Sequence, residues 1–129
     1  MVVLVTVVRN EDDILESMLA YHLNAGVDHV LATDHRSTDG TAEILRQFER
    51  DGVLTSVRED RPPISQGEVT TAMARTAAVQ LGADWVVPAD ADEFWWSREG
   101  PLRDVLTSLP ARYTVVHGLW RHFVLRPDD

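Results

Sequence analysis

Two aspartates, Asp90 and Asp92, stand one residue apart directly after an apolar stretch over residues 85–88. In an extended segment residues i and i+2 point to the same side, so the two carboxylates can approach one cation. Like charges that close repel unless a cation or a proton lies between them. Carboxylate oxygens suit Mg²⁺ or Mn²⁺, whose remaining positions are commonly filled by water and substrate phosphate. A bare Asp-x-Asp also occurs in solvated loops, but its place at a strand end, before Glu93-Phe94-Trp95-Trp96, favours a metal site.

Polar side chains also follow the two earliest apolar stretches of the chain. Arg9, Asn10 and Glu11 come after the first stretch, and Asp34 and His35 come after the second. In α/β sheets ligands bind beyond the carboxyl ends of the strands, so these side chains are expected at one edge with the aspartate pair. A carboxylate at Asp34 can accept hydrogen bonds from a base or a ribose. Asn10 and Glu11 fit a polar turn leading into a helix as well as a ligand wall, and their spacing does not decide between the two.

Several other polar or aromatic residues have a structural explanation. Ser37 or Asp39 can cap the helix that follows them, which explains that stretch without a ligand. His22 lies at helical spacing and is expected to be a packed helix residue. Of Trp95 and Trp96, one is expected to pack in the core, and either could stack on a sugar ring.

The hydrophobic pattern predicts the elements that must position these residues. Apolar, largely β-branched stretches predict strands over residues 2–8, 27–33, 53–57 and 85–88. Apolar residues at helical spacing predict helices over residues 13–23, capped by Asp12 or Asp13, and around residues 44–48, 69–81 and 102–109. Residues 58–66 are expected to form a loop, and residues 113–117 and 120–125 two late strands. The alternation predicts an α/β fold with a mainly parallel sheet.

Composition limits the class of function. The chain has 129 residues, 44% of them hydrophobic, which suits one domain with a core of its own. A net charge of −9 argues against nucleic acid or an anionic membrane as the main partner, while a divalent cation could still bridge acidic side chains to a phosphate-bearing small molecule. Cysteine is absent, which excludes disulfides and thiolate chemistry. No stretch approaches the roughly 20 apolar residues of a transmembrane helix, and we expect a cytoplasmic protein.

Familiar motifs for other chemistries are also missing. The sequence contains no Gly-x-Gly-x-x-Gly, no phosphate loop ending in Gly-Lys-Ser/Thr, no His-Glu-x-x-His and no Gly-x-Ser-x-Gly. Dinucleotide oxidoreductases, P-loop hydrolases, zinc proteases and serine esterases are therefore all disfavoured.

Four motifs occur in order along the chain. They are Val7-Val8-Arg9-Asn10-Glu11-Asp12, then Tyr21-His22 with Gly26-Val27-Asp28-His29, then Asp34-His35-Arg36-Ser37-Thr38-Asp39-Gly40-Thr41, then Asp90-Ala91-Asp92-Glu93-Phe94. Together they resemble the family 2 glycosyltransferases of the GT-A fold, in the branch with an RNE-type first motif and a DxDEF metal motif. The resemblance covers residues 1–95 and continues weakly through Trp120-Arg121-His122-Phe123.

The resemblance implies an α/β/α sandwich that transfers a sugar from a nucleotide diphospho-sugar to an acceptor, with inversion. The nucleotide-binding residues it implies are Arg9, Asn10, Glu11, Asp34, His35 and Asp90. It also implies Mn²⁺ or Mg²⁺ held by Asp90 and Asp92, where the cation would neutralise charge on the departing diphosphate. The acceptor is not identified. The general base is not assigned either, and Glu93 is a candidate on adjacency alone.

Members of this family are usually longer than this chain and carry the acceptor-binding part downstream of the metal motif. Residues 1–129 are therefore expected to form a single nucleotide-sugar-binding domain that lacks the acceptor-binding C-terminal part. The alternative is a non-catalytic nucleotide-sugar-binding or assembly domain. A metal-dependent phosphotransfer enzyme would need a supporting lysine, and the chain has none.

Overall fold

Four parallel strands form the sheet of this protein. The structure, a computed structural model, describes residues 1–61 and 65–124. Its strands are β1 (Val2–Val8), β2 (His29–Asp34), β3 (Leu54–Arg58) and β4 (Trp85–Pro88), in the spatial order β3-β2-β1-β4. Every neighbouring pair is parallel, so the carboxyl ends of all four strands lie along one edge. The predicted α/β fold with a parallel sheet is confirmed.

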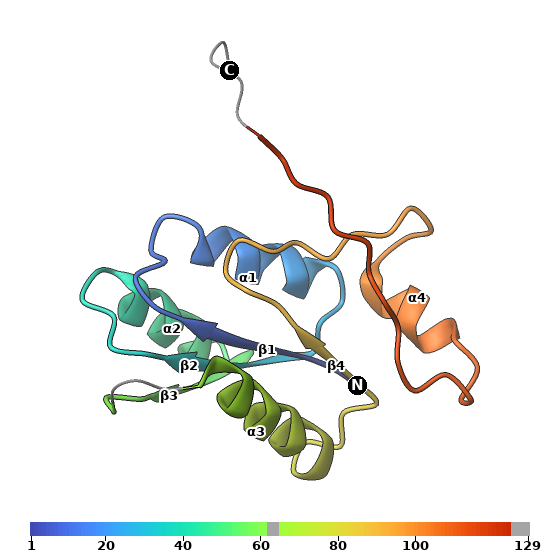
Figure 1. Cartoon of the computed structure of the whole chain (residues 1–129), viewed down its shortest axis with the longest axis horizontal. Coiled ribbons are helices and arrows are strands. Elements are labelled where there is room, and N and C mark those ends of the chain that lie inside the picture. Colours follow the sequence, from blue (N-terminus) through green and yellow to red (C-terminus); the bar gives the residue numbers. More distant parts are fainter. Residues whose placement is uncertain (62–64, 125–129) are drawn as a thin grey trace.

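Helices cover both faces of the sheet and give three layers (Figure 1). On one face lie α1 (Leu15–Asn24), α2 (Thr41–Arg50) and α4 (Leu102–Ser108), packed with Val2, Leu4 and Val8 of β1. On the other face, α3 (Gln66–Val79) packs with Val3 and Val5. Alternate residues of a strand face opposite sides of a sheet, so β1 needs apolar residues at nearly every position. This explains the continuous apolar run at the start of the chain.

A topological switch point lies between β1 and β4. The chain leaves β1 through α1 on one face of the sheet and reaches β4 from α3 on the opposite face. Because the two connections diverge, a crevice opens beyond the carboxyl ends of these strands, where ligands bind in open α/β sheets. The fold therefore places the residues that follow β1 and β4 at the position where a ligand site is expected.

The helix ends differ in part from the sequence expectation. Asp12 and Asp13 do not cap α1, which starts at Leu15 after Ile14 without a side-chain cap. Instead, Asp12 Oδ2 accepts a hydrogen bond from the Gly40 N–H at 3.0 Å, just before α2. Asp12 therefore joins two loops rather than starting its own helix.

The two late strands predicted over residues 113–117 and 120–125 are wrong for the residues that the structure describes. Residues 113–124 are exposed and belong to no strand, and Leu125 lies outside the described residues. Figure 1 shows this segment running past α4 and away from the sheet. Leu119, for example, is 97% exposed. An apolar pattern shows that a segment can extend, but a strand also requires a neighbour that pairs with it.

Two further sequence expectations concern the loop after β3 and membrane insertion. The loop predicted over residues 58–66 is shorter, because Arg58 ends β3 and Gln66 begins α3. Residues 59–61 and 65 are irregular as predicted, and residues 62–64 lie outside the described residues. Among the described helices, none is long and apolar enough to cross a membrane.

Candidate functional site

The loops that follow β1 and β2 are joined by backbone-to-side-chain hydrogen bonds. The Asn10 N–H donates to Ser37 Oγ at 3.0 Å, and Asn10 Oδ1 accepts from the Thr38 N–H at 2.8 Å. One residue further on, the Glu11 N–H donates to Thr41 Oγ1 at 2.8 Å. The expected side-chain cap of α2 is absent, because the N-cap is Gly40. Ser37 bonds the neighbouring loop instead, and Asp39 Oδ1 accepts from the N–H of Thr41, the first residue of the helix.

Two non-glycine residues in these loops have a left-handed backbone. Asn10 has φ 55° and Arg36 has φ 61°, and each lies within two residues of a strand end. A left-handed backbone costs energy for an L residue and persists where the surroundings enforce it, often at functional sites. Asn10 is held in place by the two hydrogen bonds of its backbone N–H and its side-chain oxygen.

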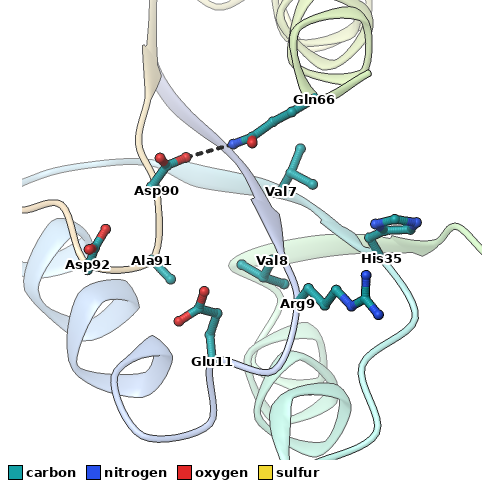
Figure 2. A pocket seen from close by; sticks show the side chains of 9 residues that line it. All are labelled: Val7, Val8, Arg9, Glu11, His35, Gln66, Asp90, Ala91 and Asp92. Carbon is teal, nitrogen blue, oxygen red and sulfur yellow. Dashed lines mark hydrogen bonds between the residues drawn. The ribbon is translucent and has the colours of Figure 1, made fainter. Parts of the chain in front are cut away.

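The segment that carries Asp90 and Asp92 is a turn, not the extended stretch expected from the sequence. The Glu93 N–H donates to Asp90 O at 3.0 Å, and Ala91 and Asp92 form the corner of the turn. The Asp90 N–H donates in return to Glu93 Oε2 at 3.1 Å. In a turn, unlike in a strand, side chains at i and i+2 are not aligned. The two carboxylates therefore leave the turn in different directions (Figure 2).

A pocket lies beyond the carboxyl ends of β1 and β4 and collects most of the expected site residues. Its lining is Val7, Val8, Arg9, Glu11, His35, Gln66, Asp90, Ala91 and Asp92. Figure 2 shows the carboxylates of Glu11, Asp90 and Asp92 on one side and the Arg9 and His35 side chains on the other. One wall is thus acidic and the opposite wall carries a guanidinium and an imidazole. Such a division suits an anion that arrives with a cation.

The charge on the acidic wall affects Glu11. Burial raises the pKa of the Glu11 carboxyl above its ordinary value of 4.5, and the carboxylates of Asp13, Asp92, Asp39 and Asp90 raise it further. A neighbouring cation would reverse this effect, because it favours the charged form of a carboxyl. The pKa is therefore raised first by burial and then by negative charge around Glu11, part of which comes from Asp90 and Asp92 on the same wall.

Three expected site residues are not part of the pocket lining. Asp34 is 3% exposed; its Oδ1 accepts from the Ser37 N–H at 3.0 Å and its Oδ2 pairs with Arg58 Nη1 at 3.2 Å. Asn10 joins the loops as described above. Glu93 turns its carboxylate back onto the Asp90 backbone. All three stabilise the backbone beneath the site, and their expected ligand contacts remain predictions.

Gln66 lines the pocket and was not foreseen from the sequence. It is the first residue of α3, and its Nε2 donates to Asp90 Oδ1 at 2.8 Å. Ser65 precedes it as the N-cap, with Oγ accepting from the Glu68 N–H. The Ser65–Glu68 spacing matches a capping box and could have predicted this helix start three residues earlier than the apolar pattern did.

The two tryptophans after the turn differ in burial. Trp95 packs against the core and its Nε1 donates to Pro88 O at 3.1 Å, which confirms core packing for one of the pair. Trp96 is 60% exposed, and the Arg121 guanidinium lies 5.6 Å from its ring centroid.

The oxygen donors of the acidic wall fit a hard divalent cation. Asp90, Asp92 and Glu11 offer carboxylate oxygens without nitrogen or sulfur competitors, the donor type that Mg²⁺ and Mn²⁺ prefer. Within residues 1–61 and 65–124, no group of three or more His, Asp or Glu side chains is arranged to hold a metal by itself. Mg²⁺ usually needs only one or two carboxylates when substrate phosphates supply other ligands. The acidic wall therefore fits a cation that binds together with its ligand.

The three-layer α/β arrangement is that of the GT-A fold, as the comparison with solved structures shows. Among solved structures, the chain is similar to the crystal structure of S. aureus TarS residues 1–349, a GT-A glycosyltransferase, with a TM-score of 0.63 and 17% sequence identity. The match covers 82% of this chain and 31% of that chain, so the chain spans about a third of the TarS chain. At this identity the likeness shows the fold alone. No protein-family model matches the sequence. No curated protein matches it either.

Proposed function

We propose that this chain is a glycosyltransferase, or the donor-binding part of one, that binds a nucleotide diphospho-sugar together with Mn²⁺ or Mg²⁺. The observation that carries the proposal is the two-sided pocket at the switch point of a GT-A fold, with Glu11, Asp90 and Asp92 on one side and Arg9 and His35 on the other. The fold is consistent with a nucleotide-sugar donor. Transfer would go to an acceptor of unknown class and proceed with inversion.

The residues of the pocket divide the work of holding a diphosphate. Asp90 and Asp92 would hold the divalent cation, which when bound neutralises charge on the leaving diphosphate. Arg9 provides a permanent positive charge and paired N–H donors that match phosphate oxygens. His35 lies on the same wall and has a ring nitrogen 3.3 Å from Arg61 O, which orients its imidazole. Nucleotide contacts through Asn10, Glu11 and Asp34 are part of the same proposal.

Melting temperature, measured with UDP or GDP, with and without Mn²⁺, tests this function. A ligand at 100 times its dissociation constant stabilises the folded state by about 2.7 kcal/mol, which raises the melting temperature measurably. Because the proposed site binds the diphosphate through a cation, we expect this shift only when nucleotide and metal are both present. Asp92→Ala and Asp90→Asn should abolish the shift and still fold. Asp51→Asn, at the exposed end of α2, is the control because it removes one carboxylate far from the pocket. The absence of a shift with any nucleoside diphosphate plus metal would refute the proposal.

A non-catalytic nucleotide-sugar-binding domain is the second candidate function. It is favoured by Glu93, the candidate base, whose carboxylate accepts a hydrogen bond from the Asp90 backbone instead of facing the pocket. Incubation of the protein with UDP-sugars and GDP-sugars separates the two. Release of the nucleoside diphosphate, lost in Asp92→Ala, would support the transferase, whereas metal-dependent binding without release would support the binding domain.

A further inference from the structure

Two consecutive residues of α1, Tyr21 and His22, hold both polar backbone atoms of Trp95. The Tyr21 hydroxyl donates to Trp95 O at 3.2 Å, and the Trp95 N–H donates to His22 Nε2 at 3.1 Å. In sequence these contacts span 74 and 73 residues, so they join the first helix to the segment that follows β4.

The hydrogen bonds of His22 define its tautomer. Its Nδ1 lies 2.8 Å from Met18 O and must carry the proton, because a carbonyl oxygen only accepts. Its Nε2 is then an unprotonated acceptor for the Trp95 N–H. The ring is 0% exposed, and this burial lowers the His22 pKa, an effect that the bond to Met18 O partly opposes. A histidine that only filled the core would not need to accept from a distant backbone amide.

The contacts on either side of Trp95 complete this attachment. The Phe94 ring meets Tyr21 edge-on at 5.2 Å and lies stacked on His22 at 6.2 Å between centroids. The Trp95 indole Nε1 donates back to Pro88 O at the end of β4. Residues 88–95, which include the Asp90–Glu93 turn, therefore form a closed loop whose far end is fixed to α1.

The same helix also sets the position of Glu11. The N–H groups of Ile14 and Leu15 donate to Glu11 O at 3.2 and 2.9 Å, so the backbone of Glu11 continues directly into α1. One rigid element thus connects to both parts of the acidic wall: Glu11 at its beginning and the Asp90–Glu93 turn through Tyr21 and His22.

From this geometry we propose that Tyr21 and His22 are positioning residues that hold the Asp90–Glu93 turn against α1, so that Asp90 and Asp92 lie on the same wall of the pocket as Glu11. The proposal rests on the proposed function, because the positioned carboxylates are those assigned to the cation and diphosphate. Tyr21 and His22 do not line the pocket, so they act through the turn and not by contact with the ligand.

Four variants test the proposal, two at the attachment and two matched controls. Tyr21→Phe keeps the ring and removes only the donor to Trp95 O, and His22→Phe keeps a buried ring and removes the acceptor. Tyr113→Phe removes the hydroxyl of a tyrosine outside the contact. His29→Phe replaces an imidazole whose Nε2 bonds Thr55 Oγ1. His29 is the first residue of β2 and so lies at the opposite edge of the sheet from the pocket.

Each variant is measured in two ways. Hydrogen exchange of the Trp95 and Asp90 amides, without ligand, reports whether the turn is held. Calorimetric titration of UDP with Mn²⁺, well below the melting temperature, reports whether the carboxylates are aligned. We expect faster exchange at both amides and affinity lower by about 10-fold in Tyr21→Phe and His22→Phe, and neither effect in the controls. In His22→Gln the amide oxygen can accept from the Trp95 N–H, and affinity should return toward that of the wild type.

The outcomes separate failure of this proposal from failure of the proposed function. If the wild type binds the nucleotide with metal, and Tyr21→Phe and a folded His22→Phe bind equally tightly, the positioning role is wrong and the function stands. If His22→Phe does not fold, Tyr21→Phe alone decides. If the wild type does not bind at all, the proposed function fails and the positioning role fails with it. A lower melting temperature with unchanged affinity shows a purely structural role and overturns the proposal.

Discussion

Asp34 and Asp90 occupy similar positions in the sheet but differ in what their carboxylates contact. Asp34 is the last residue of β2, and Asp90 follows β4 by two residues, at the same edge of the sheet. Asp34 is 3% exposed and directs both oxygens to the protein, one to the Ser37 N–H and one to Arg58. Asp90 is exposed, lines the pocket and has one oxygen bonded to Gln66.

The position of each strand in the sheet explains this difference. β2 lies between β1 and β3, so Arg58 at the end of β3 lies beside Asp34 in the register and can pair with it. β4 is at the end of the sheet order and has only β1 as a partner among the described strands. The end of β2 is therefore occupied by Arg58 of β3, whereas the end of β4 faces the crevice that it shares with β1. Being at the carboxyl edge predicts where an aspartate lies, and the neighbouring strands determine which protein groups its oxygens contact.

The largest expected effect is on folding stability in Asp34→Ala. It removes the acceptor of the buried Ser37 N–H and the partner of Arg58, and we expect it to lower the free energy of unfolding by about 3 kcal/mol. Asp90→Ala should change it by less than about 0.5 kcal/mol, as expected for an exposed residue. Urea denaturation followed by tryptophan fluorescence measures both. Equal losses in the two variants would show that the two aspartates do not differ in role.

The next largest effect is expected for Arg9→Ala on ligand affinity. Arg9 lies on the other side of the pocket from the acidic wall, with its guanidinium near His35, and loss of a hydrogen bond to a charged phosphate costs about 2 kcal/mol, or roughly 30-fold in affinity. Titration of UDP with Mn²⁺ at two salt concentrations measures it, and the difference from the wild type should shrink at high salt. Arg75→Ala, exposed on α3, is the control. Unchanged affinity in Arg9→Ala would remove the guanidinium from the proposed site.

A smaller effect is expected for Gln66→Ala, which removes the donor to Asp90 Oδ1. Because residues that orient a metal ligand typically contribute 10- to 100-fold to affinity and this contact is exposed, we expect a loss of about 10-fold for UDP with Mn²⁺. The melting temperature without ligand should stay that of the wild type. Gln80→Ala, exposed at the other end of α3, is the control. If both glutamine variants bind UDP with Mn²⁺ as tightly as the wild type, the orientation of Asp90 does not depend on its hydrogen bond with Gln66.

The smallest effect is expected for Glu11→Gln, and it depends on pH. The Glu11 pKa is raised above 4.5, first by burial and then by nearby carboxylates, so the folded state holds this proton more tightly than the unfolded state does. The stability from this group is present below pH 4.5 and is lost as the pH rises through the raised pKa. Neutral Gln avoids that loss, so Glu11→Gln should be more stable than the wild type at pH 7, by less than about 1 kcal/mol.

Denaturation at pH 7 and at pH 4 measures this difference between Glu11→Gln and the wild type. The advantage of the variant should shrink at pH 4, where the wild-type carboxyl is largely protonated. A variant less stable than the wild type at pH 7 would contradict the raised pKa. Glu16→Gln, exposed in the first turn of α1, is the control for removing a carboxylate.

Much of the fold was predictable because the sheet is covered on both faces. The continuous apolar run over residues 2–8 can be recognised without knowledge of its partners. The less apolar strands predicted over residues 27–33 and 53–57 are also present, with bounds shifted by one or two residues. The segment over residues 113–124 has the same kind of pattern but forms no strand, because pairing depends on a neighbour that a local pattern does not specify.

The candidate site was predictable in location but not in detail. The rule that ligands bind beyond strand ends correctly brought Arg9, Glu11, His35, Asp90 and Asp92 to one pocket. It could not show that Asp34 pairs with Arg58, because that contact joins residues 24 positions apart. It also did not show that Asp90 and Asp92 lie on a turn, which a local hydrogen bond from the Glu93 N–H to Asp90 O closes. His22 has the pattern of a packed helix residue, and its bond to the Trp95 amide is visible only in the folded chain.

The hydrogen bonds between the loops after β1 and β2 have a consequence for the thermodynamics of binding. Asn10, with its left-handed backbone, and Glu11 are fixed to Ser37, Thr38 and Thr41 before any ligand is present. Little backbone entropy is then lost on this wall when a ligand binds, because that entropy was already lost on folding. This surface is therefore preorganised for the proposed ligand, and loosening the contacts that Ser37 and Thr38 make with Asn10 should make binding entropically less favourable.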